Sequence, residues 1–257
     1  MLDAAGLEAY RRDGQATAPQ PIPPAVLRAV EIKMDALIAT RPDLDPNYIP
    51  HLIEIDPTWL EIAALPEILD VVEQAIGPDI ICWGSALFCK TARDGKATPW
   101  HQDGHYWPIR PLATVTVWLA IDAATPENGC LRVVPGSHRA GELYDHDRRE
   151  SDAAVLNQEL DLARFDWADP RDVVLAPGQF SVHDVYAVHG AEPNRSGKRR
   201  AGLALRYMPA GSYFDRDLAA RMTAELGVID ISRRQLHLLR GRDASGRNDI
   251  ARPPDDV

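Results

Sequence analysis

Two histidines and one aspartate in this sequence have the types and the spacing of a mononuclear iron site. His101 and Asp103 stand two positions apart, and alternate side chains of an extended segment leave on the same face, so the imidazole and the carboxylate point to one place. His189, at the end of an apolar run, is a suitable third ligand. Two His and one carboxylate on one face of an octahedron leave three positions open. Non-haem Fe(II) oxygenases use this arrangement to bind a chelating co-substrate and O2.

A basic residue follows the last of these ligands at a spacing that suits a co-substrate anchor. Arg200 stands eleven residues after His189. A guanidinium can hold the far end of a dicarboxylate through a bidentate pair of hydrogen bonds. Arg199 is as plausible from charge alone. Because neighbours in a strand point to opposite faces, one of the two arginines must lie outside.

Helices are expected at both ends of the chain. Asp3 is placed to cap a short helix that stops near Gly14, Pro23 and Pro24 are placed to open a longer helix, and residues 66–76 have the pattern of a third. Two C-terminal helices are predicted at 215–226 and 233–239. The helices before residue 80 are expected to support the rest of the domain.

The middle of the chain has the pattern of an antiparallel double-sheet jelly roll. Its apolar or β-branched runs, bounded by Pro, Gly and Asn, are 80–90, 114–122, 130–135, 172–176, 179–189 and 201–208. The predicted fold is therefore mainly β with flanking helices, a double-stranded β-helix (cupin-like jelly roll) core with N-terminal helical support. A charged segment, 140–169, interrupts the strands and is expected to be a helical lid or a mobile loop over the barrel mouth.

One domain is expected, over residues 1–240, with the jelly-roll core at about 80–210. Residues 241–257 are polar and are predicted to be a disordered tail. No internal repeat or second domain is indicated.

Six motifs carry a family resemblance. In order they are the segments 100–106 (WHQDGHY), 118–122 (WLAID), 127–138 (ENGCLRVVPGSH), 175–178 (LAPG), 188–190 (VHG) and 199–207 (RRAGLALRY). With these motifs the chain closely resembles the phytanoyl-CoA dioxygenase family of Fe(II)/2-oxoglutarate oxygenases, from about residue 80 to 210. The motifs are specific for the family and carry no information on the substrate.

The resemblance implies roles for single residues. His101, Asp103 and His189 would hold Fe(II), 2-oxoglutarate would chelate the iron through its keto-acid end, and its distal carboxylate would meet Arg200, which the resemblance selects over its neighbour. Trp118 matches a family position that lines the co-substrate pocket, although a Trp in an apolar strand serves as often in the core.

Further residues lie near the expected substrate. Gln102 and His105 flank the ligands, and alternation places His105 on the ligand face, where it would hydrogen-bond to a ligand or to the substrate. Tyr106 either lines the barrel mouth or packs against the N-terminal helices. His183 shares parity with His189, so it either points inward or is a hydrogen-bonded core histidine.

One position departs from the family pattern. Many relatives carry a hydroxyl residue that touches the co-substrate where this chain has Ala191, so Thr114 or Thr116 is expected to serve instead, or the co-substrate affinity is altered. Halogenating relatives lack the carboxylate ligand, whereas Asp103 is present here. The resemblance thus favours hydroxylation over halogenation, with desaturation or ring formation as other outcomes.

Charge and composition limit the partners and the location. The chain has 28 Lys and Arg against 38 Asp and Glu, a formal charge of −10, which disfavours nucleic acid and anionic membranes. The N-terminus lacks the pattern of a signal peptide, no run is long enough to span a membrane, and three cysteines stand in apolar runs. A reducing cytoplasm and a small-molecule substrate are expected, with a monomer and a homo-oligomer both open.

Two functions from different classes follow. The first is a dioxygenase that uses O2 and 2-oxoglutarate to hydroxylate an unactivated carbon, with release of succinate and CO2. The second is a non-catalytic metal-binding jelly roll that acts as a sensor or scaffold. The presence of Arg200 favours the first, because a silent site has no need of a dicarboxylate anchor.

Overall fold

Three of the N-terminal helices begin where the sequence predicts, and the short elements between residues 52 and 63 were not predicted. The computed structural model describes residues 1–149 and 151–251. Asp3 caps the first helix by accepting a hydrogen bond from the Gly6 N–H, and this helix ends at Gly14, whose φ of 79° is in the left-handed region. The helices of this part are α1 (Ala4–Asp13), α2 (Pro24–Thr40), α3 (Leu52–Ile55), the 3-10 turn η1 (Pro57–Trp59), α4 (Leu60–Ala63) and α5 (Pro66–Ile76).

Two antiparallel sheets make the core. The large sheet has the order β1-β11-β6-β13-β3-β15, with β2 also on β3, and the small sheet has the order β10-β7-β12-β4. The strands of the large sheet are β1 (Gln15–Thr17), β2 (Ile49–Pro50), β3 (Ile80–Lys90), β6 (Val115–Ala120), β11 (Phe180–Asp184), β13 (Arg200–Pro209) and β15 (His237–Arg240); those of the small sheet are β4 (Thr98–His101), β7 (Leu131–Val133), β10 (Arg171–Val173) and β12 (His189–Ala191). The structure confirms the jelly-roll prediction.

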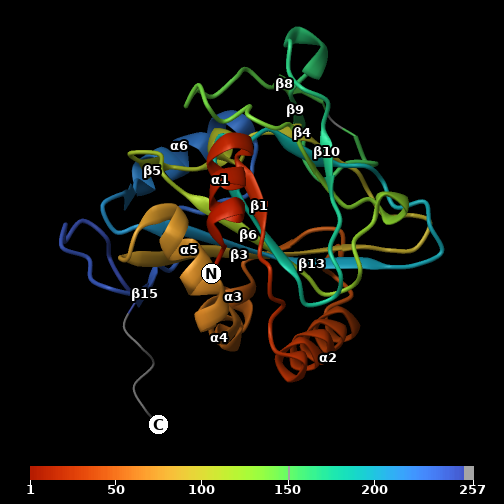
Figure 1. Cartoon of the computed structure of the whole chain (residues 1–257), viewed down its shortest axis with the longest axis horizontal. Helices are drawn as coiled ribbons and strands as arrows, with labels where there is room; N and C mark the ends of the chain where they lie inside the picture. Colours follow the sequence, from red (N-terminus) through yellow and green to blue (C-terminus); the bar gives the residue numbers. More distant parts are fainter. Residues whose placement is uncertain (150, 252–257) are drawn as a thin grey trace.

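Short elements complete the fold. They are the pair β5 (Ile109–Arg110) and β14 (Tyr213–Phe214), the pair β8 (Asp147–Arg148) and β9 (Gln158–Glu159), the 3-10 turns η2 (Asp103–Tyr106), η3 (Pro126–Asn128) and η4 (Leu162–Arg164), and α6 (Arg216–Leu226). In Figure 1 the helices α2 to α5 lie on one side of β3 and β13, and the small sheet with β8 and β9 lies on the other. Among the described residues no helix is both long and apolar enough to cross a membrane.

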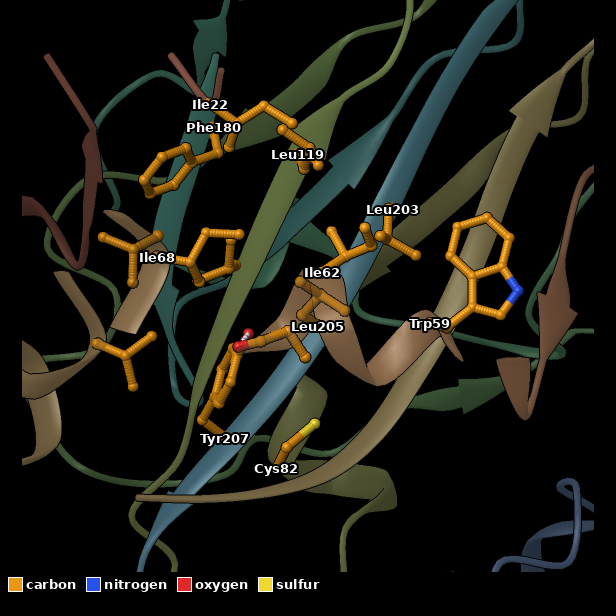
Figure 2. Close-up of a cluster of buried hydrophobic side chains, with 14 of the residues drawn as sticks. Ile22, Trp59, Ile62, Ile68, Cys82, Leu119, Phe180, Leu203, Leu205 and Tyr207 are labelled. Carbon is orange, nitrogen blue, oxygen red and sulfur yellow. Dashed lines mark hydrogen bonds between the residues drawn. The ribbon is translucent and has the colours of Figure 1, made fainter. Parts of the chain in front are cut away.

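The central strand β13 separates an apolar layer from the site. Leu203, Leu205 and Tyr207 point toward the helices and are fully buried there, with Ile62 of α4 in the same cluster (Figure 2). The Tyr207 hydroxyl donates a hydrogen bond of 3.0 Å to the Ala63 carbonyl, which ties α4 to the sheet. By the two-residue period of a strand, the residues between them face the interior of the jelly roll.

Two of the predicted secondary-structure elements are wrong. Residues 179–189 are not one strand, because the Asp184 carboxylate accepts a hydrogen bond of 2.8 Å from the Tyr186 N–H and makes a turn that carries the chain from β11 to β12 in the other sheet. Residues 233–239 are not a helix. Their second half forms β15, in which His237 and Leu238 pair with the exposed edge of β3, so the sheet overrides the local helix pattern.

The segment 140–169 is not a helical lid. Its described residues form an irregular layer with the pair β8 and β9 and the single turn η4. The Leu160 N–H donates to the Trp100 carbonyl and the Val155 N–H to the Ala97 carbonyl, so the segment continues the ladder beyond β4. Tyr144, Phe165 and Trp167 then pack as one aromatic cluster within the segment.

The end of the described chain also differs from the predicted disordered tail. Residues 241–251 lie on the body of the protein: the Arg242 N–H donates to Asp79, the Asn248 side chain donates to the Ser212 carbonyl, and the Ala251 N–H donates to the Leu236 carbonyl. The polar composition of this segment is thus used in hydrogen bonds to the body. The rest of the predicted tail, 252–257, lies outside the described residues.

Candidate active site

The three predicted iron ligands meet at the edge of the small sheet. His101 ends β4 and His189 begins β12, and the two are direct partners in the strand register. Gln102 keeps an extended backbone (φ −111°, ψ 128°), so Asp103 leaves on the same side as His101 before the chain turns into η2. One ligand atom from each of the three residues lies within 4.8 Å of the others.

The two histidines present the ring nitrogen that a metal needs. His101 Nδ1 lies 2.8 Å from the Pro99 carbonyl and His189 Nδ1 lies 2.9 Å from the Ala187 carbonyl. A carbonyl only accepts, so each Nδ1 carries the proton and donates it, which leaves a lone pair on each Nε2. These nitrogens lie 3.6 and 3.9 Å from Asp103 Oδ1. The two histidines and Asp103 can therefore bind a divalent metal without a change in the tautomer of either imidazole.

Burial and neighbouring groups set the charges of the triad. Burial lowers the pKa of His189 well below its usual value, so the ring is neutral. Burial by itself would raise the pKa of the Asp103 carboxyl, but the surrounding imidazoles outweigh it and hold this pKa well below its usual range. The Thr116 hydroxyl also donates to Asp103 Oδ2 at 2.9 Å. One anion and neutral nitrogen donors are the protonation states that metal binding requires.

His183 points inward. Its Nε2 lies 3.4 Å from Asp103 Oδ2, and its ring centroid lies 4.5 Å from that of His189. Neither ring nitrogen has a hydrogen-bond partner within the described residues. Of the two interpretations that the strand parity left open, the structure therefore favours the inward one over a hydrogen-bonded core histidine.

A cavity of about 340 Å³ lies between the two sheets, and the triad lines it. Arg200 enters one end of this cavity from β13 and is only 2% exposed. Its Nε donates to the Gly129 carbonyl at 3.1 Å, while its two terminal nitrogens make no hydrogen bond within the described part of the chain. Arg199 points the other way and pairs with Asp122 and Asp35. Strand parity thus places Arg200 inside, as the resemblance implies.

Trp118 forms the wall beside this arginine. The Arg200 guanidinium lies 5.2 Å from the centre of the Trp118 ring, and both side chains line the cavity. The ring lies against Gly202, where an added Cβ would come within 2.0 Å of it. The glycine of the segment 199–207 is therefore what allows the indole to lie along β13.

A buried lysine lies behind the same end. Lys90 is the register partner of Arg200 on β3, is 1% exposed, and donates to the carbonyls of Ala191 and Glu192. Burial, with the adjacent positive charge of Arg200, lowers the pKa of Lys90 to about 6. At neutral pH most of the charge at this end is therefore that of Arg200.

Gln102 and His105 have different surroundings from those expected. The Gln102 amide donates to the carbonyls of Glu142 and Tyr186 and accepts from the Tyr144 N–H, so it joins the segment 140–169 to the turn after β11. His105 lies in η2, where the alternation of a strand no longer applies, and its Nε2 hydrogen-bonds to Gln158 Oε1 at 2.6 Å. Neither side chain lines the cavity.

Tyr106 and the threonines are placed as follows. Tyr106 lines the cavity, as one of its two interpretations required, and its buried hydroxyl has no hydrogen-bond partner within the described residues. The Thr116 hydroxyl donates to Asp103, and the Thr114 hydroxyl has no hydrogen-bond partner in the described part of the chain. Ala191 lines the cavity and is the register partner of Thr98 on β4. Thr98, which also lines the cavity, therefore has a hydroxyl on the strand next to Ala191.

His146 is a residue whose role the sequence did not suggest. Its Nε2 accepts a hydrogen bond of 3.1 Å from the Gln102 N–H, its Nδ1 donates to the Tyr144 carbonyl, and its ring stacks on His105 at 4.1 Å. Burial, followed by the adjacent His105, lowers the pKa of His146 to about 3 and keeps it neutral. No local pattern in the charged segment 140–169 marks this residue, because the contacts are made across the fold.

Arg206, Arg234 and Trp83 also line the cavity and were not among the predicted site residues. Arg206 shares the parity of Arg200 on β13, a signal that the sequence did contain. Trp83 and Gly84 together face one residue of β13, since the register shifts between Arg206 and Tyr207. This bulge turns Trp83 into the cavity, and nothing in the apolar run 80–90 predicts it.

Comparison with known proteins agrees with this site. The model of the phytanoyl-CoA dioxygenase family matches residues 2–202. The chain is 31% identical over 186 residues to the peroxisomal phytanoyl-CoA dioxygenase of Bos taurus, covering 70% of this chain and 55% of that protein. It is 25% identical to the L-proline trans-4-hydroxylase of Streptomyces griseoviridis, over 60% of this chain and 64% of that enzyme. It thus spans little more than half the length of the bovine relative.

The solved structures show the same fold. A non-heme monooxygenase, ThoJ, superposes with a TM-score of 0.75 at 24% identity, over 97% of this chain and 88% of that one. The epimerase SnoN, solved with Fe3+ and alpha ketoglutarate, superposes with a TM-score of 0.68 at 21% identity, over 89% and 94%.

The fold is a jelly roll, and its interior holds the two-histidine, one-carboxylate donor set of the non-haem iron class. The chain belongs to the phytanoyl-CoA dioxygenase family, as the motifs predicted. The cofactors of this family are Fe(II), 2-oxoglutarate and O2, and the two imidazoles and one carboxylate of the triad are a donor set that fits this iron.

Proposed function

We propose that this protein is an Fe(II)- and 2-oxoglutarate-dependent dioxygenase that hydroxylates an unactivated carbon of a small molecule. In the net reaction the substrate, O2 and 2-oxoglutarate give the hydroxylated product, succinate and CO2. The observation that carries this proposal is that the triad and the guanidinium of Arg200 line one buried cavity. Fe(II), when bound, would supply the coordination sites for the keto acid and O2.

The residues of the chain would have distinct tasks in this reaction. His101, Asp103 and His189 would hold the iron through the two Nε2 lone pairs and a carboxylate. Thr116 would orient Asp103 by the hydrogen bond to its Oδ2. Arg200 would bind the distal carboxylate of 2-oxoglutarate, because its terminal nitrogens are unused and a guanidinium fork matches a carboxylate.

The presence of Asp103 supports hydroxylation over halogenation. A site that takes chloride in place of the carboxylate ligand would lack this residue. Desaturation and ring formation use the same cofactors, so product analysis by mass spectrometry separates them: hydroxylation adds one oxygen atom to the substrate, whereas desaturation removes two hydrogen atoms.

Succinate release tests the proposal. The protein is incubated with Fe(II), 2-oxoglutarate and O2, and a small-molecule library is screened for compounds that accelerate the formation of succinate. We expect at least one compound to do so and to become hydroxylated. If the protein bound iron but formed no succinate with any compound or alone, the non-catalytic sensor or scaffold would be the better description.

We also propose that residues 1–240 act as one domain in a reducing cytoplasm. The large sheet contains β1 and β15, from near the two ends of this range, which supports a single unit. Cys82, Cys89 and Cys130 are buried and unpaired, which suits a reducing compartment. Limited proteolysis and cell fractionation test the two statements: an early cut that leaves two stable halves, or recovery of the protein in an organelle fraction, would refute the corresponding one.

A further inference from the structure

The end of the cavity away from Arg200 contains a second buried arginine on the same strand. Arg206 lies six residues after Arg200 on β13, which corresponds to roughly 20 Å between their Cα atoms, and both side chains line the cavity. Its register partner on β6 is Thr116, the residue that donates to Asp103. Arg206 is therefore placed beside the metal triad, on the side opposite the co-substrate anchor.

Arg206 has no counter-ion among the residues that the structure describes. It is 7% exposed, it makes no hydrogen bond or ion pair within the described residues, and its Nε is buried without a partner. Its guanidinium carbon lies 5.5 Å from the centre of the Trp107 ring. Burying a charge without a partner is unfavourable, so a structure that keeps one beside a cavity is suited to an anion that enters the cavity.

Arg234 lies next to it and is partly compensated. Its Nη1 lies over Gly84, the register partner of Arg206 on β3, where an added Cβ would come within 2.1 Å. Arg234 is 4% exposed and forms an ion pair with Glu54, its Nε lying 3.7 Å from Oε1. Two buried arginines and one carboxylate leave one positive charge at this end of the cavity.

The walls around these arginines are apolar and aromatic. Trp83 and Trp107 pack edge to face with ring centres 4.6 Å apart, Tyr106 lines the cavity beside them, and Ile231 closes the side next to Arg234. The cavity of about 340 Å³ is near the lower end of the range of roughly 300–1,000 Å³ for small-molecule sites, and it must also hold 2-oxoglutarate. The part of the substrate that enters it is therefore small.

We propose that the substrate to be hydroxylated is a carboxylic acid with a compact apolar or aromatic body, whose carboxylate binds Arg206 and Arg234. This inference rests on the proposed function and adds the class of substrate. One uncompensated charge matches a monoanion, and the two guanidinium groups offer the paired N–H donors that a carboxylate accepts. With the carboxylate held at Arg206, the body of the acid lies between the arginine and the triad, where the reacting carbon must be.

Matched pairs of acids and amides test this inference by binding. The anaerobic protein with Fe(II) and saturating 2-oxoglutarate, which occupies the Arg200 end, is titrated by calorimetry with phenylacetate, 3-phenylpropanoate, cyclohexanecarboxylate and hexanoate, each beside its primary amide. We expect at least one acid to bind at least about tenfold more tightly than its amide, since the pairs differ in the charge that the arginines would recognise. Equal binding within every pair, or no binding by any of the acids, would overturn the inference.

Substitutions locate the acid preference. Arg206→Met keeps an unbranched apolar stem without the charge and should reduce acid binding to the level of the amide. Arg234→Met should weaken acid binding to a smaller extent. Arg199→Met, immediately before β13 and with its side chain paired to Asp122 and Asp35, should leave the preference unchanged. An acid preference that survives in both Arg206→Met and Arg234→Met would refute the assignment, and the measurement on the unmodified protein decides even if a variant does not fold.

The same titrations separate this inference from the function on which it rests. Binding of 2-oxoglutarate, measured first, depends on Arg200 and on iron. If 2-oxoglutarate did not bind, the proposed function itself would fail. If 2-oxoglutarate bound normally and no acid were preferred over its amide, only the substrate class would be wrong.

Discussion

Two buried basic residues lie at each end of the active-site cavity, and the charge of the pair is reduced in a different way at each end. At one end Arg200 stands beside Lys90, and at the other Arg206 stands beside Arg234. Burial, with the adjacent Arg200, lowers the pKa of Lys90 to about 6, so this ammonium loses its proton at neutral pH. Arg234 keeps its proton and is paired with Glu54 instead.

The difference follows from the chemistry of the two side chains. An ammonium in a dry site can become a neutral amine at a moderate cost, whereas a guanidinium stays protonated in proteins and has to be compensated by an anion. Even burial and the adjacent Arg206 lower the pKa of Arg234 only to about 10. Each end is thus left with about one positive charge, which is suited to one carboxylate.

The largest effect is expected where the two ends meet, at the metal. Asp103→Ala removes the only anion of the triad and leaves a site that holds a divalent metal poorly. It should abolish the visible charge-transfer band that forms on anaerobic addition of Fe(II) and 2-oxoglutarate, and lower succinate formation by more than about a hundredfold. Asp172→Ala, which removes an exposed carboxylate of β10, is the control. Normal hydroxylation by Asp103→Ala would show that the ligand assignment is wrong.

Removing the anchor should affect one end only. Arg200→Ala deletes a charge-assisted bidentate pair and should raise the concentration of 2-oxoglutarate that is needed by about tenfold to a hundredfold. Arg199→Ala, whose side chain pairs outside with Asp122, should change it much less. The measurement is the dependence of the charge-transfer band on 2-oxoglutarate. Equal effects at the two positions would mean that the anchor is not Arg200.

The neutral lysine predicts a pH dependence of stability. Lys90 binds its proton in the unfolded chain up to about pH 10.5 and in the folded protein only below about pH 6. Between these values the unfolded state binds more protons, so the free energy of unfolding rises with pH, by up to about 1.4 kcal/mol per pH unit. Lys90→Met should lack this contribution.

Urea unfolding at pH 7, 8 and 9 measures the contribution of Lys90. It is the difference between the unmodified protein and Lys90→Met in the slope of the free energy of unfolding against pH. Because the other titrating groups are common to both proteins, the difference isolates the lysine. If the free energy of unfolding changed with pH equally in the two proteins, Lys90 would be charged inside the fold. The two ends of the cavity would then not differ in how their charge is reduced.

The smallest effect is expected at the counter-ion. Glu54→Gln removes the negative charge that compensates Arg234, and Glu54 is only partly buried, so its influence is screened by water. An acid that binds at Arg206 should bind the variant about twofold to fivefold more tightly. Calorimetry against the matched amide, whose affinity should stay the same, measures the change. Weaker binding of the acid would show that Glu54 contributes to holding it.

Local patterns in the sequence were sufficient to predict the residues of the triad and most of the helices and strands. The apolar run 80–90 is the strand β3, and Asp3 and Pro66 begin helices where their side chains predicted them. The spacing of His101 and Asp103 brings them together because Gln102 is extended. Such features depend on the backbone period or on one capping side chain, and these are properties of neighbouring residues.

The end of the cavity away from Arg200 was decided by the tertiary structure. Trp83 faces the cavity because of a bulge in the pairing of β3 with β13, and Arg234 comes from a segment whose sequence favours a helix but which lies against the edge of β3. His146 reaches Gln102 across 44 positions of the chain. Strand register and contacts between distant segments depend on which surfaces are buried together, and no local pattern contains that information. The sequence by itself therefore determined the family and the metal chemistry, and the folded chain determined which charges face the cavity.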